Sequence, residues 1–317
     1  MRYPTPRTAL LCFIALTIIS GCRPRSYDTE PSAISCPTAA EVYGYRGSPV
    51  DSATSCTYGK INTSTAGIAG IAPFTSHIQF SQGAYHIGEN NYYVFKATDT
   101  ARTLLRISSA GAVTPLTNSA YGSRFDGLVY NRFNGKLYCF RTAGGTSHIA
   151  EITVSGSTYT TADLATTLLP EMHDNATVDA STGDIYYQSF AGSMNFNVEK
   201  YHPGGAVTTI ATGMPIDLWG IRYNPNDNNL YAVRAGTTYE FVKINSSGAL
   251  SVLSTLPQIN FKKFSATFDP CTDHYILSFQ QFTGPFLNGH LMQLSTAGAV
   301  LQHDSMSTVY MGLDVKY

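Results

Sequence analysis

Carboxylate and amide side chains recur at related positions along this 317-residue sequence, and together they could hold a metal ion. They are Asp126, Asp174, Asn175 and Asp217. Oxygen ligands of this kind suit Ca²⁺. The four residues therefore form a candidate calcium site, provided that the fold gathers them at one mouth of a channel. The alternative is a water-filled channel in which these side chains accept hydrogen bonds from turn amides.

One histidine stands out as a candidate for acid–base chemistry. His173 precedes Asp174, and a structural role is the alternative for it. None of the eight histidines lies in an H-E-x-x-H motif, and no G-x-S-x-G nucleophile motif occurs. The sequence therefore assigns no catalytic residue and favours a binding function over an enzymatic one.

Aromatic residues in or beside variable segments offer a different kind of site. Exposed aromatic side chains in such segments can bind a glycan, a peptide or a partner protein. Packing within the loops themselves is the alternative. The residues concerned are Trp219, Phe190, Phe196, Phe282 and Phe286.

The elements that must position these residues follow from an internal repeat. The segment GIRYNPNDNNLY at 220–231 is matched by 127–138, 175–186, 265–276 and, more weakly, 82–93, with a period of about 46 residues. The matched segments begin at residues 82, 127, 175, 220, 265 and 312, which we call the register positions. A fixed period of this length indicates an array of similar units that bury their apolar faces against one another.

Each unit reads as four short antiparallel strands. Segments of alternating apolar residues are separated by turns rich in Gly, Asn, Asp and Pro. The sequence after residue 22 shows no helical periodicity over 10 or more residues. Four-stranded units at this spacing are typical of a β-propeller. The sequence therefore predicts an all-β fold whose site lies around the central channel, where the innermost strands begin.

The two ends of the sequence predict how the ring closes. Residues 311–317 match only the first strand of a unit, whereas 41–46 and 58–62 resemble the second and third strands of the unit at 229–245. A composite blade, with one strand from the C-terminal end and three from the N-terminal part, completes a ring of six blades.

The cysteines behind residue 22 show no metal-ligand spacing. In the predicted ring, Cys36 and Cys271 lie on the same face of adjacent blades, so we expect a disulfide between them. Cys56 lies at the opposite end of its strand and fits Cys36 poorly, and Cys139 reads as a buried thiol. Four unpaired cysteines acting as small apolar residues are the alternative.

The pattern resembles the six-bladed propellers of exported bacterial proteins, including a family classed as a domain of unknown function. The resemblance rests on the Cys36-Pro37 start, the repeated units and FDPCTDHYILSF at 268–279, and it covers roughly residues 36–317. It implies the fold and export but no catalytic residues. NHL-type and lactonase-type propellers share the architecture, and the lactonase type uses a similar metal-centred site.

The first residues are typical of an export signal. Arg2 and Arg7 precede a short apolar stretch at 9–19, which is too short to span a bilayer as a helix. Ser20-Gly21-Cys22 follows directly, and this resembles the lipobox of a bacterial lipoprotein. We therefore expect cleavage before Cys22 and lipidation of that cysteine. An ordinary secretory signal is the alternative.

These observations divide the chain into a signal peptide at 1–21, a lipidated tether at 22–35 and a six-bladed propeller at 36–317. Lipid on Cys22 would hold the propeller at a membrane of the cell envelope, outside the cytoplasm. Arg23 is not the aspartate linked to inner-membrane retention, so the outer membrane is favoured in a Gram-negative cell. Charged residues make up only 13% of the sequence and leave a net charge of −1, which gives no basic patch for nucleic acid.

The favoured function is therefore a lipid-anchored envelope propeller that binds a protein or glycan ligand. One alternative is a hydrolase or lactonase-type enzyme that uses Ca²⁺ in the channel. Another alternative is a structural scaffold of the envelope.

Overall fold

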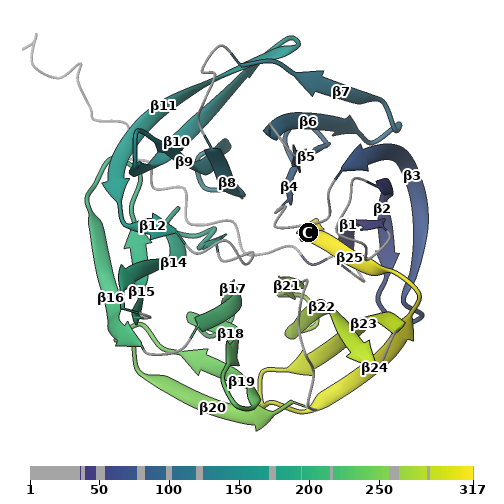
Figure 1. Cartoon of the computed structure of the whole chain (residues 1–317), viewed down its shortest axis with the longest axis vertical. Coiled ribbons are helices and arrows are strands. Elements are labelled where there is room, and N and C mark those ends of the chain that lie inside the picture. The colour runs from purple at the N-terminus through teal and green to yellow at the C-terminus, as the bar shows by residue number, and fades with distance from the viewer. Residues whose placement is uncertain are drawn as a thin grey trace, which may run out of the picture. The chain divides into compact units, whose positions relative to one another are not determined.

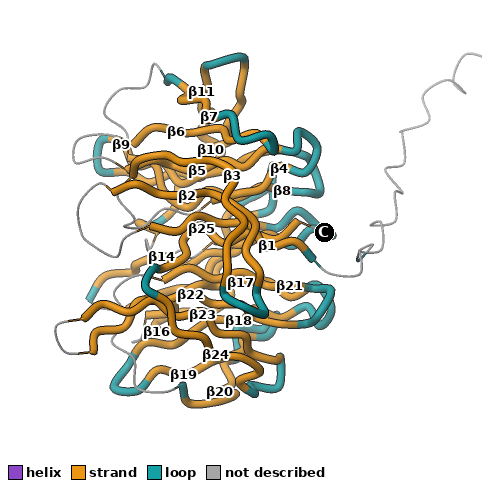
Figure 2. The backbone as a smooth tube through the Cα atoms, turned by 90° about the vertical axis from the view of Figure 1, so that its right-hand side faces the viewer, coloured by secondary structure: helices purple, strands orange, loops and turns teal. Residues whose placement is uncertain are grey.

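The computed structural model describes residues 36, 40–47, 54–76, 83–97, 102–118, 124–170, 176–193, 195–214, 217–256, 264–283 and 286–316. These residues form strands and turns without a helix, as Figure 2 shows, and they belong to the compact unit of residues 34–317. No helix among them is long and apolar enough to cross a membrane. The predicted signal peptide and tether lie outside the described residues.

Six antiparallel sheets are arranged in a ring with their first strands toward the centre, which confirms the predicted six-bladed β-propeller (Figure 1). Blade 1 contains β25 (Val309–Lys316), β1 (Glu41–Gly47), β2 (Thr54–Asn62) and β3 (Gly67–Ser76). Blade 2 contains β4 (Gly83–His86), β5 (Asn91–Ala97), β6 (Arg102–Ser108) and β7 (Val113–Leu116). Blade 3 contains β8 (Arg124–Asn131), β9 (Lys136–Ala143), β10 (Thr146–Ser155) and β11 (Thr158–Thr167).

The other three blades follow in chain order. Blade 4 contains β12 (Leu169–Pro170), β13 (Ala176–Val178), β14 (Ile185–Gly192), β15 (Asn195–Tyr201) and β16 (Val207–Met214). Blade 5 contains β17 (Asp217–Asn224), β18 (Asn229–Ala235), β19 (Tyr239–Ile244) and β20 (Leu250–Thr255). Blade 6 contains β21 (Phe264–Asp269), β22 (His274–Thr283), β23 (Phe286–Ser295) and β24 (Val300–Met306). Blade 4 departs from the simple pattern, because both β12 and β13 pair with β14.

Blade 1 closes the ring as the sequence predicts. Strand β25, from the C-terminal end, pairs with β1 in antiparallel register, with Val42 opposite Val315 and Arg46 opposite Tyr310. Strands β2 and β3 complete the same sheet. A closed ring leaves no blade without neighbours, so every blade can bury both of its faces.

The apolar core lies between blades rather than within them. Each of the six clusters of buried residues combines side chains of two adjacent blades. Between blades 1 and 2, for example, the rings of Tyr58 and Tyr92 stack with centroids 4.5 Å apart. This arrangement explains the repeat, because a single unit has no core of its own.

Amide side chains at the ends of inner strands tie neighbouring blades together. Asn131, the last residue of β8, donates a hydrogen bond to the carbonyl of Gly183 in blade 4, at 2.8 Å. Asn224 ends β17 and donates to Asp273 of blade 6, at 2.9 Å. Both amides are buried, so these bonds also satisfy polar groups that water does not reach.

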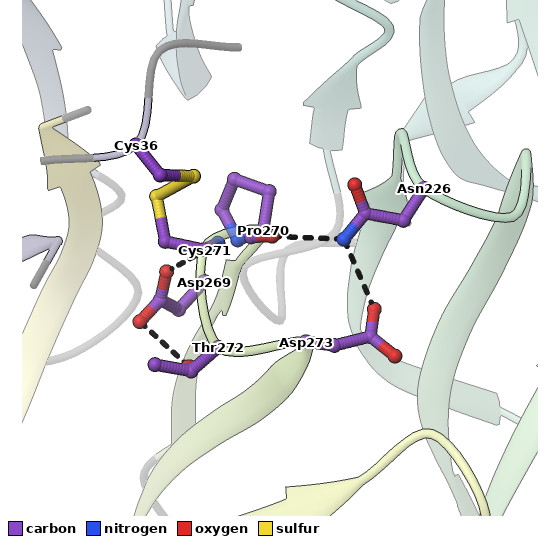
Figure 3. Close-up of a disulfide and its surroundings, with 7 residues drawn as sticks. All are labelled: Cys36, Asn226, Asp269, Pro270, Cys271, Thr272 and Asp273. Atoms are coloured by element: carbon purple, nitrogen blue, oxygen red, sulfur yellow. Dashed lines mark hydrogen bonds between the residues drawn. A yellow bond between two sulfur atoms is a disulfide. The ribbon is translucent and has the colours of Figure 1, made fainter. Parts of the chain in front are cut away.

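A disulfide joins Cys36 to Cys271, as predicted, with 5.3 Å between the Cα atoms (Figure 3). Cys271 lies in the turn between β21 and β22, where its backbone N–H donates to Asp269 at 2.9 Å. The bridge therefore fixes the chain just before blade 1 to blade 6 at the point of closure. Cys139 is a buried thiol, as expected, and Cys56 is buried as well.

Candidate functional site

The channel wall is shaped by glycines at three register positions. Gly127, Gly220 and Gly312 have φ angles of +59°, +65° and +59°, which a residue with a Cβ adopts only at a cost. A register shift accompanies each of them, between Asp126 and Val129, between Trp219 and Arg222, and in the pairing of β25 with β1. Such bulges break the regular alternation of side chains and re-aim the residues that follow.

The residues that follow these three glycines line a polar cavity of about 80 Å³ in the channel. The cavity is lined by the inner strands of all six blades and by two of the turns that follow them. Its volume is sufficient for several water molecules or a small polar group. Its lining carries three charged side chains, Arg132, Arg222 and Asp314.

Arg222 lies inside the wall and is only 6% exposed. Its Nη1 donates to the carbonyl oxygens of Ile221, at 2.7 Å, and of Ala176 in blade 4, at 3.2 Å. Carbonyl oxygens satisfy N–H groups but carry no net charge, so these bonds leave the positive charge of the guanidinium in place.

Arg132 reaches the same cavity from the turn between β8 and β9. Its Nη2 donates to the carbonyl of Val315, so that a side chain of blade 3 contacts the inner strand of blade 1. This contact places a second guanidinium beside the carboxylate of Asp314, which precedes Val315.

Among the described residues that line the cavity, Asp314 is the acidic one. One carboxylate oxygen accepts from the backbone N–H of Tyr85, at 2.7 Å, and the other from that of Val315, at 2.8 Å. Burial raises the pKa of this carboxyl, while Arg132, the two N–H donors and Arg222 act to lower the pKa. The net effect is a raised pKa, so the cavity brings two guanidinium groups together with a carboxyl group that burial disposes toward its protonated form.

The predicted calcium site is only partly within the described residues. Asp126 is 7% exposed at the start of β8. Asp217 begins β17 and accepts a hydrogen bond from the indole Nε1 of Trp219. Asp174 and Asn175 lie outside the described residues, as does His173. Among the residues that the structure describes, no three His, Cys, Asp or Glu side chains gather to hold a metal, so the four-residue calcium site stays a prediction.

Three of the five predicted binding aromatics have described side chains. Trp219 is half-buried between blades 5 and 6, with its ring 6.0 Å from those of Phe264 and Tyr239. Phe190 and Phe196 contact each other across the β14–β15 hairpin, at 5.6 Å between centroids. The side chains of Phe282 and Phe286 lie outside the description, although their backbones pair in the β22–β23 hairpin. Their role in binding stays a prediction.

Comparison with known proteins gives the fold and no family. No family model and no curated protein matches the chain. TolB from Acinetobacter baumannii is 14% identical with a TM-score of 0.59, over 86% of this chain and 66% of that one. A chain of a nidogen–laminin complex is 16% identical with a TM-score of 0.58, over 87% and 98%. A protein of unknown function from Bacteroides caccae is 12% identical with a TM-score of 0.51, over 84% and 94%. At these identities the similarity shows a shared propeller fold alone.

Sequence reasoning missed the three charged residues of the cavity. Arg222 and Asp314 both lie two residues after a register glycine, where the other units have Ala84, Val129 and small hydroxyl residues. A charged residue at a position where the other units have a small or apolar residue was the signal that could have identified Arg222 and Asp314. Arg132 lies in the turn directly after β8, five residues after the register position Gly127. Its approach to the cavity is visible only in the three-dimensional structure.

Proposed function

We propose that this protein is a lipid-anchored binding module of the cell envelope, and that its channel cavity receives an anionic group of the ligand. The observation that carries the proposal is the charge of the cavity, which two arginines and one aspartate line. A cleft with low-dielectric walls concentrates the potential of such charges. Guanidinium groups also match carboxylates and phosphates in shape and hydrogen bonding.

The setting supports a binding role outside the cytoplasm. Disulfides such as Cys36–Cys271 persist in oxidising compartments. Among the solved structures with this fold, the nidogen–laminin structure is a complex of two proteins. A carboxylate on a protein or on an acidic glycan would supply the anionic group.

Calorimetric titration of the purified protein with inorganic phosphate and with citrate tests the cavity. We expect one site whose affinity falls about 10-fold to 100-fold in Arg132→Gln, the usual effect of losing a charge-assisted hydrogen bond. Arg141→Gln is the matched control, because it removes the same charge from a surface ion pair with Asp163. Binding of neither anion, or equal binding by Arg132→Gln, would contradict the proposal.

Metabolic labelling with a palmitate analogue tests the anchor. Cys22→Ser is expected to lose the label and to leave the membrane fraction, because a thioether-linked lipid needs this cysteine. Cys12→Ser, within the predicted signal peptide, is the control and is expected to keep the label. A labelled, membrane-bound Cys22→Ser protein would show that the anchor lies elsewhere.

A further inference from the structure

Two histidines from neighbouring strands of blade 6 meet away from the channel cavity. His290 lies on β23 and His303 on β24, and Nδ1 of His290 is 3.1 Å from Nε2 of His303. The hydroxyl oxygen of Ser305 lies 3.3 Å from the same Nδ1. Two potential ligand atoms, from His303 and Ser305, thus lie close to Nδ1 of His290 in the outer two strands of the blade.

The pair is held by its surroundings. The strand register sets His290 opposite Ser305 and Met292 opposite His303. The ring of Phe279 stacks on His290 with centroids 5.0 Å apart and planes 13° apart. This support fixes the orientation of the His290 ring before any ligand arrives, as a well-built site requires.

The contact between the two rings uses only one nitrogen of His290. A neutral imidazole has one N–H and one acceptor nitrogen, and both need partners when they are buried. His290 is 5% exposed, and its Nε2 has no hydrogen-bond partner among the described residues. Nε2 stays without a partner whether Nδ1 contacts His303 or a metal ion, so the case for a metal depends on Nδ1, on His303 Nε2 and on the Ser305 hydroxyl.

The separation of the two nitrogens matches chelation of one metal ion. Two imidazole nitrogens at about 2.05 Å from one ion are about 2.9 Å apart at a right angle and about 3.3 Å apart at the tetrahedral angle. The observed 3.1 Å lies between these limits. His303 is exposed, so an ion from solvent can reach the pair.

We propose that His290 Nδ1 and His303 Nε2 bind one first-row divalent transition metal ion, with the Ser305 hydroxyl and water in the remaining positions. Imidazole ligands suit Zn²⁺, Ni²⁺ and Cu²⁺, whereas Ca²⁺ takes oxygen ligands. When the metal binds Nδ1, the proton of the neutral His290 ring resides on Nε2, so no net proton is released. The site is independent of the anion-binding cavity.

The protonation state of the pair is compatible with metal binding. Burial lowers the pKa of both imidazoles, and the neighbouring His303 lowers that of His290 further. Asp304 acts in the opposite direction on the pKa of His303. The neutral imidazole, which these downward shifts favour, is the form that ligates metals.

The test titrates the purified full chain with Zn²⁺ by calorimetry and with Cu²⁺ by electron paramagnetic resonance. We expect one Zn²⁺ per chain and a Cu²⁺ spectrum with hyperfine coupling to two nitrogens. His303→Gln should weaken Zn²⁺ binding at least 100-fold. Losing an outer-shell partner typically costs about 10-fold to 100-fold in metal affinity, and the loss of a direct ligand should cost no less. Its Cu²⁺ spectrum should lose the two-nitrogen pattern.

Two further variants make the result decisive. His202→Gln removes an exposed histidine of blade 4 whose Nδ1 contacts Asp184, and it should bind Zn²⁺ like the unmodified chain. Ser305→Ala should keep both nitrogens and bind Zn²⁺ less than 10-fold more weakly. Thermal melts with chelator present check that His303→Gln is folded. No binding by the unmodified chain, or equal binding by a folded His303→Gln, would overturn the proposal.

Discussion

The Cys36→Ser, Cys271→Ser double variant is expected to unfold at a temperature about 5 to 10 °C below that of the unmodified protein. The disulfide spans 235 residues, so it restricts the unfolded chain over nearly the whole propeller. Cross-links that close such long loops contribute about 3–5 kcal/mol. For a protein of this size each kcal/mol corresponds to about 2 °C.

The location of the bridge adds to the size of this effect. It holds the segment before β1 to the turn of blade 6, where the N-terminal and C-terminal parts of the ring meet (Figure 3). Without it, closure rests on the pairing of β1 with β25 and on the blade 6–blade 1 core. Fluctuations that open the ring at this junction should therefore become more frequent.

Thermal melts and urea titrations with and without reductant measure the effect. The unmodified protein in reductant should match the double variant, and the double variant should not respond to reductant. Cys56 and Cys139 remain in both proteins as buried cysteines outside the disulfide, so they serve as an internal control for non-specific thiol chemistry. Equal midpoints for both proteins would mean that closure depends on strand pairing alone.

The fold could be predicted because its design is local and repeated. Each unit of about 46 residues carries its own turns, and the matching ends of the chain specify the composite blade. The disulfide followed from the same register, because it placed Cys36 and Cys271 on one face of adjacent blades. The presence of two short strands, β12 and β13, beside β14 in blade 4 could not be predicted. Strand β12 has only two residues, which is too short to show strand periodicity.

The charged cavity escaped prediction for a geometric reason. Alternation along a strand predicts which side chains share a face, but one extra residue in a bulge reverses the assignment for everything after it. The bulges at Gly127 and Gly220 lie just before Val129 and Arg222. The His290–His303 pair escaped for a related reason, because it depends on the register between β23 and β24.

Gly220→Ala is expected to destabilise the propeller by about 3 kcal/mol or more. A Cβ at this position would lie 2.2 Å from the ring of Phe264 and 2.8 Å from the Cβ of Ala266. The backbone has φ of +65°, which costs alanine about 1–2 kcal/mol. Overpacking in a rigid core adds about 1–3 kcal/mol.

The cost at Gly220 cannot be avoided by a small local shift. The carbonyl of Gly220 accepts a hydrogen bond from the hydroxyl of Tyr275, at 2.6 Å, within the buried core between blades 5 and 6. Moving the backbone away from Phe264 would weaken this bond and leave buried polar atoms without partners. Tyr92 donates to the carbonyl of Gly312 in the same way, also at 2.6 Å, so the contact belongs to the repeated design.

Gly213→Ala separates the two contributions to this cost. Gly213 lies in β16 with φ of +62°, but a Cβ there would meet no atom within 4 Å. Gly213→Ala should therefore lower the free energy of unfolding only by the cost of positive φ for alanine, about 1–2 kcal/mol. Urea unfolding of both variants gives the difference, which isolates the close approach of the blade 6 aromatics to the inner strand of blade 5. If Gly220→Ala lost no more stability than Gly213→Ala, positive φ alone would explain why the register positions of the channel wall are glycine.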